Sequence, residues 1–407
     1  MRLGAAILGC TLILAVAGCG HHRAQPSESP AKPSAPNLST TKRGVLEPDL
    51  SALPRDPSDK PPARPGEYRK LTAEECRYFA VKNAPLADDL DAHPENRTPS
   101  HPHLHPGQPS PSEADTSRKV RGYLADELRN KSAGEALDKF YQLAQAEGQF
   151  DLLAKSLKEL RARLGDAEDA ERRGLADRAG VDNLRVQVLD LEAKVAELEA
   201  GIDSLNAALR AHLGMDSADP LSIWPDDPLH VRSEDVDIDE AVRNGLFYRS
   251  DLNLIRTLLA DDGEGADDLA QALLKQISPL LARLKSNPLV SLLTVKRNRT
   301  SREATQRQLQ SLLEGRERQA EAEIRAAALA LRGHRLATVA RSAEVRRHAA
   351  TVTELEKKAA AGQPVTAELT KAKLDLWKAQ GELLKSAVEW RRADVKLRQA
   401  MGLLVRE

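Results

Sequence analysis

Over long stretches of the chain, apolar residues recur at alternating intervals of four and three positions, the 3.5-residue period of a coiled coil. The pattern is most regular over 181–214, and its members there are Leu184, Val188, Leu191, Val195, Leu198, Ile202, Leu205 and Leu209. The pattern returns over 369–400, where leucine alternates with alanine. Because alanine lets helix axes approach closely, the second segment is predicted to pack tightly against a neighbouring helix.

Each of these two helices is preceded by another predicted helix. Phenylalanine and leucine at helical spacing mark one over about 118–164, and a segment rich in alanine and arginine marks the other over about 307–358. Glycine-bearing breaks join the pairs at Ala179-Gly180-Val181 and at Gly362-Gln363-Pro364-Val365. Pro364 cannot continue a preceding helix but fits a first helical turn. The sequence therefore predicts an all-α fold of two long antiparallel hairpins.

The N-terminus has the pattern of an export signal. A basic start precedes an apolar run over 3–18, which is shorter than the roughly 20 residues that span a bilayer. The run ends in Val16-Ala17-Gly18-Cys19, which resembles the lipobox of bacterial lipoproteins. We predict a lipoprotein signal peptide over 1–19 and lipidation of Cys19, with an ordinary secretory signal as the alternative. By that resemblance, Gly20 in place of aspartate favours the outer membrane, with the protein facing the periplasm.

Two segments have no periodic apolar face. Residues 20–69 are rich in Pro, Ser, Ala and charge, and residues 92–116 contain six prolines. Neither can bury enough apolar surface to offset the entropy of ordering, so both are predicted to be flexible. The second carries His101, His103 and His105, whose imidazoles are zinc or copper ligands in other settings. A proline-rich segment fixes no ligand geometry, so we favour a solvated linker over a metal site.

Composition removes several classes of function. The chain of 407 residues has 60 Lys and Arg against 61 Asp and Glu, a net charge of −1, which excludes a broadly basic nucleic-acid binder. Aromatic residues are only 3% of the chain, too few for a large globular enzyme core. The sequence has no phosphate-binding loop, nucleophile elbow or His-Glu-x-x-His motif. We therefore predict neither catalysis nor a cofactor.

The two hairpins begin alike. Residues 71–86 and 236–252 each place a polar N-cap, Thr72 or Asp237, before an acidic first turn and an apolar helical face. The offset between the two segments is 165 residues. Duplicated hairpins of this size indicate a repeat architecture.

At this point the chain resembles the outer membrane efflux protein family, the TolC-like conduits. That family's repeats open with a pattern close to L-T-x-E-E-A-x-x-x-A-x-x-N-N-P-x-L, which residues 71–86 follow with Cys76 in the alanine place. The second copy keeps Glu240-Ala241 and Arg249-Ser250-Asp251-Leu252. Each repeat closes with a glycine turn, an Ala- and Leu-spaced helix and a glycine, here Gly214 or Gly402. The resemblance covers roughly residues 70–404.

The resemblance implies a trimer whose helical hairpins form a periplasmic tunnel beneath a shared β-barrel. It implies a first repeat over 70–235, interrupted by the proline-rich insertion, and a second over 236–407. The sequence patterns expected of the membrane strands are missing. The proline-rich insertion cannot form the hydrogen-bond ladder of a β-sheet. In the second repeat, no aromatic residue lies between Arg249 and Asp375 to flank a membrane strand. We therefore predict little or no β-barrel.

The glycine breaks have two interpretations. They either only turn one helix into the next or, by the resemblance, lie at tunnel tips that meet a periplasmic adaptor and an inner-membrane pump. The docking residues are then Gly180, Val181, Gly362, Pro364 and Val365. The leading hypothesis is a lipid-anchored outer-membrane efflux component with a helical tunnel. The alternative is a periplasmic coiled-coil scaffold or adaptor on the same anchor.

Overall fold

The computed structural model describes residues 68–92, 111–216, 221–229, 231, 235–261, 270 and 298–406. The chain divides into two units, Met1–Asn37 and Leu38–Glu407, and every described residue belongs to the second. Four long helices dominate it: α3 (Pro111–Arg172), α4 (Arg178–His212), α10 (Asn298–Ala360) and α11 (Thr366–Ala400). The shorter elements are β1 (Tyr68–Leu71), α1 (Ala73–Lys82), α2 (Pro85–Ala92), β2 (Ser222–Pro225), α5 (Ile238–Tyr248) and α6 (Ser250–Ala260).

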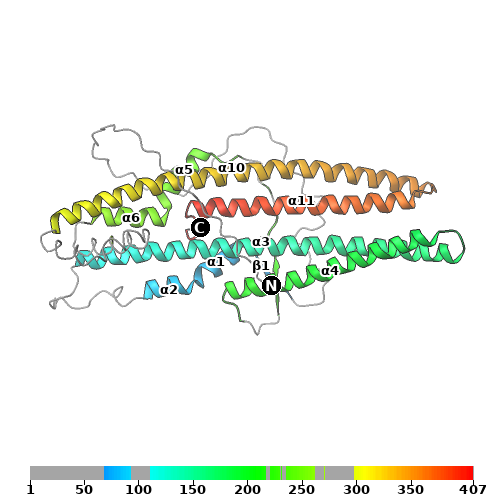
Figure 1. The fold of residues 1–407 in the computed structure, drawn as a ribbon, viewed down its shortest axis with the longest axis horizontal. Coiled ribbons are helices and arrows are strands. Elements are labelled where there is room, and N and C mark those ends of the chain that lie inside the picture. Colours follow the sequence, from blue (N-terminus) through cyan, green and yellow to red (C-terminus); the bar gives the residue numbers. More distant parts are fainter. Residues whose placement is uncertain are drawn as a thin grey trace, which may run out of the picture. The chain divides into compact units, whose positions relative to one another are not determined.

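The long helices form two antiparallel hairpins that lie side by side (Figure 1). Helix α3 pairs with α4, α10 pairs with α11, and α11 packs on α3 to join the hairpins. The order across the layer is therefore α4, α3, α11, α10. The predicted all-α fold of two helical hairpins is confirmed. None of the described helices carries an apolar stretch long enough to cross a membrane.

Several element bounds differ from the predicted ones. Helix α3 begins at Pro111, so residues 111–116 of the segment predicted to be flexible are helical. A proline at the first helical position loses no hydrogen bond, which explains why the helix starts there. Residues 68 and 69, predicted as the end of the N-terminal tether, lie in β1. The rest of the tether, the signal peptide with Cys19, and most of the proline-rich insertion lie outside the described residues.

Strand β1 pairs in parallel with β2, so that Tyr68 lies opposite Ser222. The pairing holds the start of the first repeat against the crossover between the repeats. Trp224 of β2 is 1% exposed, and its ring meets the Tyr68 ring edge to face at 5.8 Å. The sequence did not predict this pair because each strand has only four residues and its partner is about 150 positions away.

The predicted position of the first hairpin turn is wrong. The chain reverses at Gly174, where φ is 72°, and not at Gly180. Gly180 lies in the first turn of α4, where its N–H donates to the side chain of the N-cap Asp177. A positive φ favours glycine, and aspartate is among the best N-caps, so both residues support this arrangement. The second turn is where it was predicted, at Gly362, where φ is 79°.

The predicted repeat is built from equivalent contacts. Thr72 and Glu75 form a reciprocal capping box at the start of α1, and the Asp237 side chain caps α5. Helices α4 and α11 both end at a glycine with positive φ, Gly214 and Gly402. In each repeat this glycine packs against the chain just after the opening helix. Asn83 Nδ2 donates to the Leu213 carbonyl at 2.8 Å, and a Cβ on Gly402 would lie 3.2 Å from Arg249 Cα.

The largest apolar cluster joins both repeats where α1, α3, α4, α5, α10 and α11 meet. Phe140 and Leu143 of α3 are fully buried there, and Trp390 of α11 is 3% exposed. Cys76 is also fully buried, and burial raises the pKa of its thiol far above the usual range. Since the thiolate is the reactive form, Cys76 acts as a small core residue.

Close approach of α3 and α11 depends on glycine. A Cβ on Gly148 would lie 2.4 Å from Leu384 Cδ2 in the core, whereas a Cβ on Gly122 of the same helix would meet nothing within 4 Å. We expect Gly148→Ala to be about 1–3 kcal/mol less stable than Gly122→Ala by urea unfolding. Both variants gain the same helix propensity, so the difference isolates the contact with Leu384. Equal stabilities would show that Leu384 moves aside without cost.

Candidate functional site

The outward face of α4, at one edge of the layer, carries a second apolar seam. The predicted seam of this helix faces α3, and Val188, Ile202 and Leu209 are buried there. A further set of exposed residues keeps a seven-residue repeat on the opposite face: Val186, Leu189, Ala193, Ala196, Ala200 and Ala207. Val186 and Leu189 are 56% and 57% exposed. The heptad spacing is that of a helix with two neighbours, and the described part of the chain supplies one of them, α3.

Helix α10, at the other edge of the layer, also has a buried face and an exposed seam on the opposite side. The face toward α11 buries Ile324, Leu331 and Val345. The opposite face exposes a strictly alternating set at intervals of four and three: Ala322, Ala326, Leu329, Gly333, Leu336, Ala340, Ala343, Arg347 and Ala350. Leu329 and Leu336 are 56% and 55% exposed. Small residues on both edges would let two helix axes approach closely. We call these two faces the α4 edge seam and the α10 edge seam.

Contacts across the layer set the two edge seams in register. At one level lie the Arg161–Glu192 ion pair of α3 and α4, the Glu159–Lys373 ion pair of α3 and α11, and the cluster of Ala372 with Val352 and Leu355. Ala196 lies four residues beyond Glu192 along α4, moving away from the hairpin turn. Ala350 lies just beyond Val352 and Leu355 along α10, also moving away from its turn. The two alanines, one on each edge seam, are therefore at about the same level.

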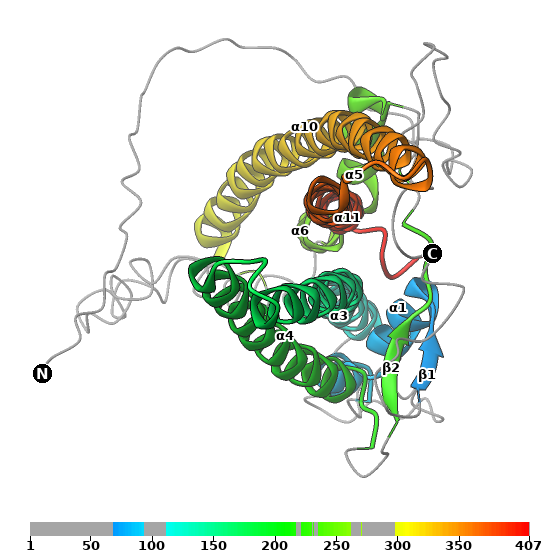
Figure 2. The same cartoon turned by 90° about the vertical axis from the view of Figure 1, so that its right-hand side faces the viewer.

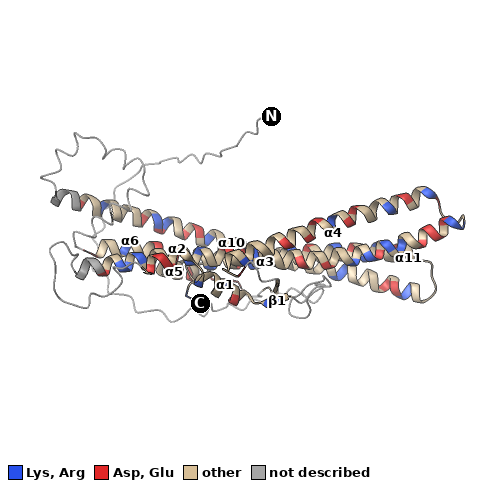
Figure 3. Ribbon diagram, turned by 90° about the horizontal axis from the view of Figure 1, so that it is seen from below, with Lys and Arg blue, Asp and Glu red and all other residues tan. Residues whose placement is uncertain are grey.

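One face of the two central helices is polar. Figure 2 shows α1, β1 and β2 together on one side of α3. On α11, Arg391 and Arg398 point toward these elements, since both line a cavity with α1. The opposite face of α11 lies half a turn away. That face carries Lys371, Lys378, Lys385 and Glu382, and the corresponding face of α3 carries Gln142 and Gln149. Charged residues of both signs run along all four long helices (Figure 3).

The two hairpin turns lie at the same end of the layer, on the right in Figure 1. Gly362 and Pro364 are exposed there and Val365 is half-buried, as docking residues would have to be. Val181 is 1% exposed, because it lies inside the first turn of α4. The sequence analysis missed Leu175, which follows the turn glycine and is 78% exposed. A leucine directly after glycine in a charged segment was the available signal.

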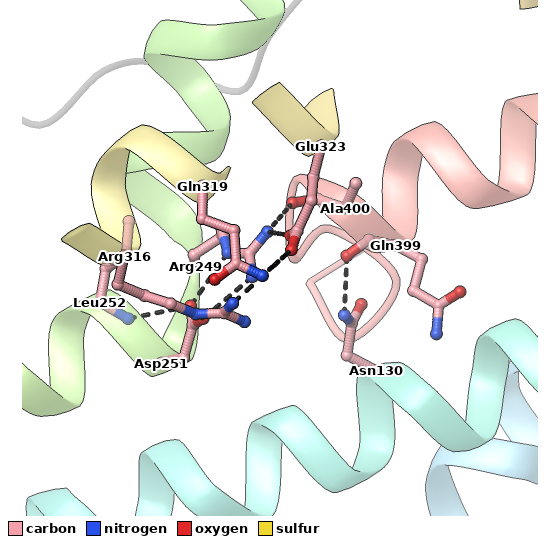
Figure 4. Close-up of polar contacts among 9 residues, drawn as sticks. All are labelled: Asn130, Arg249, Asp251, Leu252, Arg316, Gln319, Glu323, Gln399 and Ala400. Atoms are coloured by element: carbon pink, nitrogen blue, oxygen red, sulfur yellow. Dashed lines mark hydrogen bonds and ion pairs between the residues drawn. The ribbon is translucent and has the colours of Figure 1, made fainter. Parts of the chain in front are cut away.

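Arg249 is the buried centre of a partly exposed ionic cluster where the second repeat closes (Figure 4). Its guanidinium contacts Asp251 at 2.9 Å and Glu323 at 2.7 Å, and it donates to the Ala400 carbonyl at the end of α11. Arg316 contacts Asp251 from α10 at 2.7 Å. The Arg249 side chain is 8% exposed. We call Arg249, Asp251, Arg316 and Glu323 the Arg249 cluster.

The electrostatics of the Arg249 cluster follow from burial and pairing. Burial alone would raise the pKa of Asp251, but the hydrogen bond and charge of Arg249, together with Arg316, hold it below its usual value. Glu127 of α3 lies close to this cluster. Burial raises the pKa of Glu127, and the charges of Asp251 and Glu323 add to the effect. The contacts of the cluster join α6, α10 and the end of α11 around the junction of α5 and α6.

Metal binding finds no support in the described part of the chain, where no group of three or more His, Cys, Asp or Glu side chains could hold an ion. The candidate ligands His101, His103 and His105 lie outside the described residues.

Comparisons with known proteins agree on the fold. No protein-family model matches the chain, and no curated protein sequence matches it. Among solved structures, the outer-membrane channel OprN superposes with a TM-score of 0.56 at 14% identity, covering 89% of this chain and 99% of OprN.

Two further channels are similar. The open state of the Neisseria gonorrhoeae MtrE outer membrane channel has a TM-score of 0.53 at 14% identity, covering 90% of this chain and 99% of MtrE. The outer membrane protein VceC of Vibrio cholerae has a TM-score of 0.51 at 14% identity, covering 82% and 93%. This chain therefore has the fold of the outer-membrane efflux channels, the TolC-like fold that its sequence resembles.

Proposed function

We propose that this protein is an outer-membrane efflux-type component whose copies join edge to edge into a helical tunnel. The observation that carries the proposal is the pair of edge seams, which are exposed in the described part of the chain. The α4 edge seam of one copy packs against the α10 edge seam of the next. Such a head-to-tail contact uses two different surfaces, so it continues from copy to copy until a ring closes. By analogy with TolC-like conduits, the ring has three copies.

The polar faces of α3 and α11 support an aqueous path inside that ring. Lysine, glutamate and glutamine side chains on this face remain hydrated, so solutes can pass without crossing apolar surface. The tunnel is passive, because the energy for transport is supplied by a pump in the inner membrane and the tunnel only conducts the solute onward. Lipidation of Cys19 attaches the assembly to the outer membrane, because multiple acyl chains bind a bilayer firmly.

We further propose that the turns dock a periplasmic adaptor, which connects the tunnel to an inner-membrane pump. Leu175 at the first turn is the main apolar contact, and Gly362, Pro364 and Val365 form the second contact. Gly180 and Val181 then act indirectly, by starting α4 at the right position. The Leu175 side chain is 78% exposed at the end of a hairpin, which leaves it accessible to a partner.

Cysteine cross-linking tests the ring. We expect the double variant Ala196→Cys with Ala350→Cys to form disulfide-linked species up to trimer, and none larger, under mild oxidation in detergent. Few disulfides should form through the native cysteines, because Cys76 is fully buried and Cys10 and Cys19 belong to the predicted signal and lipid anchor. The control is Ala196→Cys with Lys378→Cys, which lies at about the same level but on the polar face, and it should stay uncross-linked.

A monomeric mass for the lipidated protein, with no cross-linking of the first pair, would overturn the tunnel. It would instead favour the periplasmic scaffold, which needs the hairpins but no closed ring.

A further inference from the structure

A cavity of about 320 Å³ lies where the first repeat, the crossover and the end of the second repeat meet. Its walls come from α1, α3, the loop after β2, and α11. Its charged lining residues are Glu74, Arg77, Asp227, Arg391, Asp394 and Arg398. The edge seams, the polar face and the turns do not use this cavity, so it goes beyond the proposed tunnel.

The lining is balanced in charge, with three arginines and three carboxylates. Some of these groups already have partners. The Tyr141 hydroxyl donates to Asp227 Oδ2 at 2.9 Å, and Arg398 Nε lies 3.3 Å from Asp394 Oδ2. Burial raises the pKa of Tyr141, so its hydroxyl stays protonated and remains a donor. A ligand of one sign would leave the opposite charges of the wall without compensation.

Arg391 is the least satisfied member of the lining. Its Nη2 donates to the Pro228 carbonyl at 2.5 Å, but it lies 3.7 Å from Asp227, beyond a hydrogen bond. Its Nε–H is buried and finds no hydrogen-bond partner among the described residues. The side chain is 15% exposed and stacks beside the Trp390 ring at 5.5 Å. Arg391 also lines the cavity, so a carboxylate bound there can pair with the outer N–H groups of its guanidinium.

We propose that this cavity binds a small zwitterion, an amino acid or the end of a short peptide. The ligand carboxylate pairs with Arg391 and Arg77, and its ammonium pairs with Glu74 and Asp394. Leu137 and Val395 supply the apolar contact for its side chain. A volume of about 320 Å³ is at the small end for ligand sites, which fits one or two residues.

Calorimetric titration of the full-length lipidated protein tests this site with three related probes. L-alanyl-L-alanine carries both charges, its N-acetyl derivative lacks the ammonium, and L-alanyl-L-alaninamide lacks the carboxylate. We expect the zwitterion to bind in the micromolar to low millimolar range, and each charge-deleted probe to bind at least tenfold more weakly. Saturable heat with the zwitterion alone would support the assignment.

Variants localise the binding to the cavity. Arg391→Gln and Glu74→Gln should each weaken binding of L-alanyl-L-alanine at least tenfold, whereas Arg346→Gln on the exposed face of α10 should not change it. Glu74 is exposed, so its variant tests the site even where Arg391→Gln affects folding. No saturable heat with the zwitterion, or equal binding of the N-acetyl probe, would overturn the assignment. Neither outcome affects the cross-linking test of the ring.

Discussion

Replacing Arg249 with methionine is expected to lower the free energy of unfolding by about 3–5 kcal/mol. The side chain is 8% exposed and holds two carboxylates and the last carbonyl of α11. Methionine keeps most of the apolar length but leaves Asp251 and Glu323 partly buried without their shared cation. Removing one partner of a buried ion pair costs more than the pair contributes, because the remaining charge stays desolvated.

Urea unfolding followed by circular dichroism measures this loss. Arg341→Met is the matched control, since Arg341 pairs with Glu344 on the surface and is 46% exposed, and we expect a change within about 0.5 kcal/mol. Arg316→Met should lie between the two, because Arg316 is 30% exposed. A loss below about 1 kcal/mol for Arg249→Met would mean that water screens the cluster.

The effect of Arg249 should also depend on pH. The pKa of Asp251 is lower in the folded protein than in the unfolded chain, where it is about 3.9. Its pairing therefore contributes stability that is fully present above about pH 4 and is lost as pH falls through the lower folded value. The gap between wild type and Arg249→Met should narrow over that acidic range.

Replacing Leu336 with aspartate is expected to abolish assembly while leaving the protomer folded. Leu336 is 55% exposed in one copy, so a polar side chain there costs the isolated protomer almost nothing. In the proposed ring the same position is buried against α4 of the neighbour. Losing a buried leucine costs about 1.5–3 kcal/mol, and an unpaired carboxylate in the seam adds to that.

Light scattering in mild detergent measures the mass of the assembly. We expect Leu336→Asp to raise the concentration needed for assembly well beyond tenfold, with an unchanged circular dichroism spectrum. Leu175→Asp is the control, because Leu175 is 78% exposed at a turn and lies outside both edge seams. If Leu336→Asp assembled like wild type, the α10 edge seam would not be the contact between copies.

Local sequence patterns carried the prediction of the helices and their pairing. The apolar seam of α4 lies on α3 as its period predicted, and Ala372, Ala379 and Leu383 of α11 are buried toward α10. The caps at Thr72 and Asp237 begin α1 and α5 as predicted. These features depend on residues within a few turns of one another, so the sequence alone determined them.

The turn at Gly174 could have been predicted from the sequence, but Gly180 was chosen as the turn instead. Both glycines precede the same helical pattern, and the choice depends on Asp177, which caps α4 from between them. An aspartate three residues before Gly180 was the signal that the helix had already begun there.

The tertiary structure alone decided which surfaces are joined and which remain open. Arg77, Asp227 and Arg391 come from segments more than 140 positions apart, and only the packing of α1, the crossover and α11 brings them to one cavity. The alanine spacing of the two edge seams is present in the sequence. A heptad pattern, however, indicates that another helix packs there without identifying which helix, or which copy of the chain, provides it. Because α3 and α11 fill the centre of the layer, the outer faces of α4 and α10 remain exposed among the described residues.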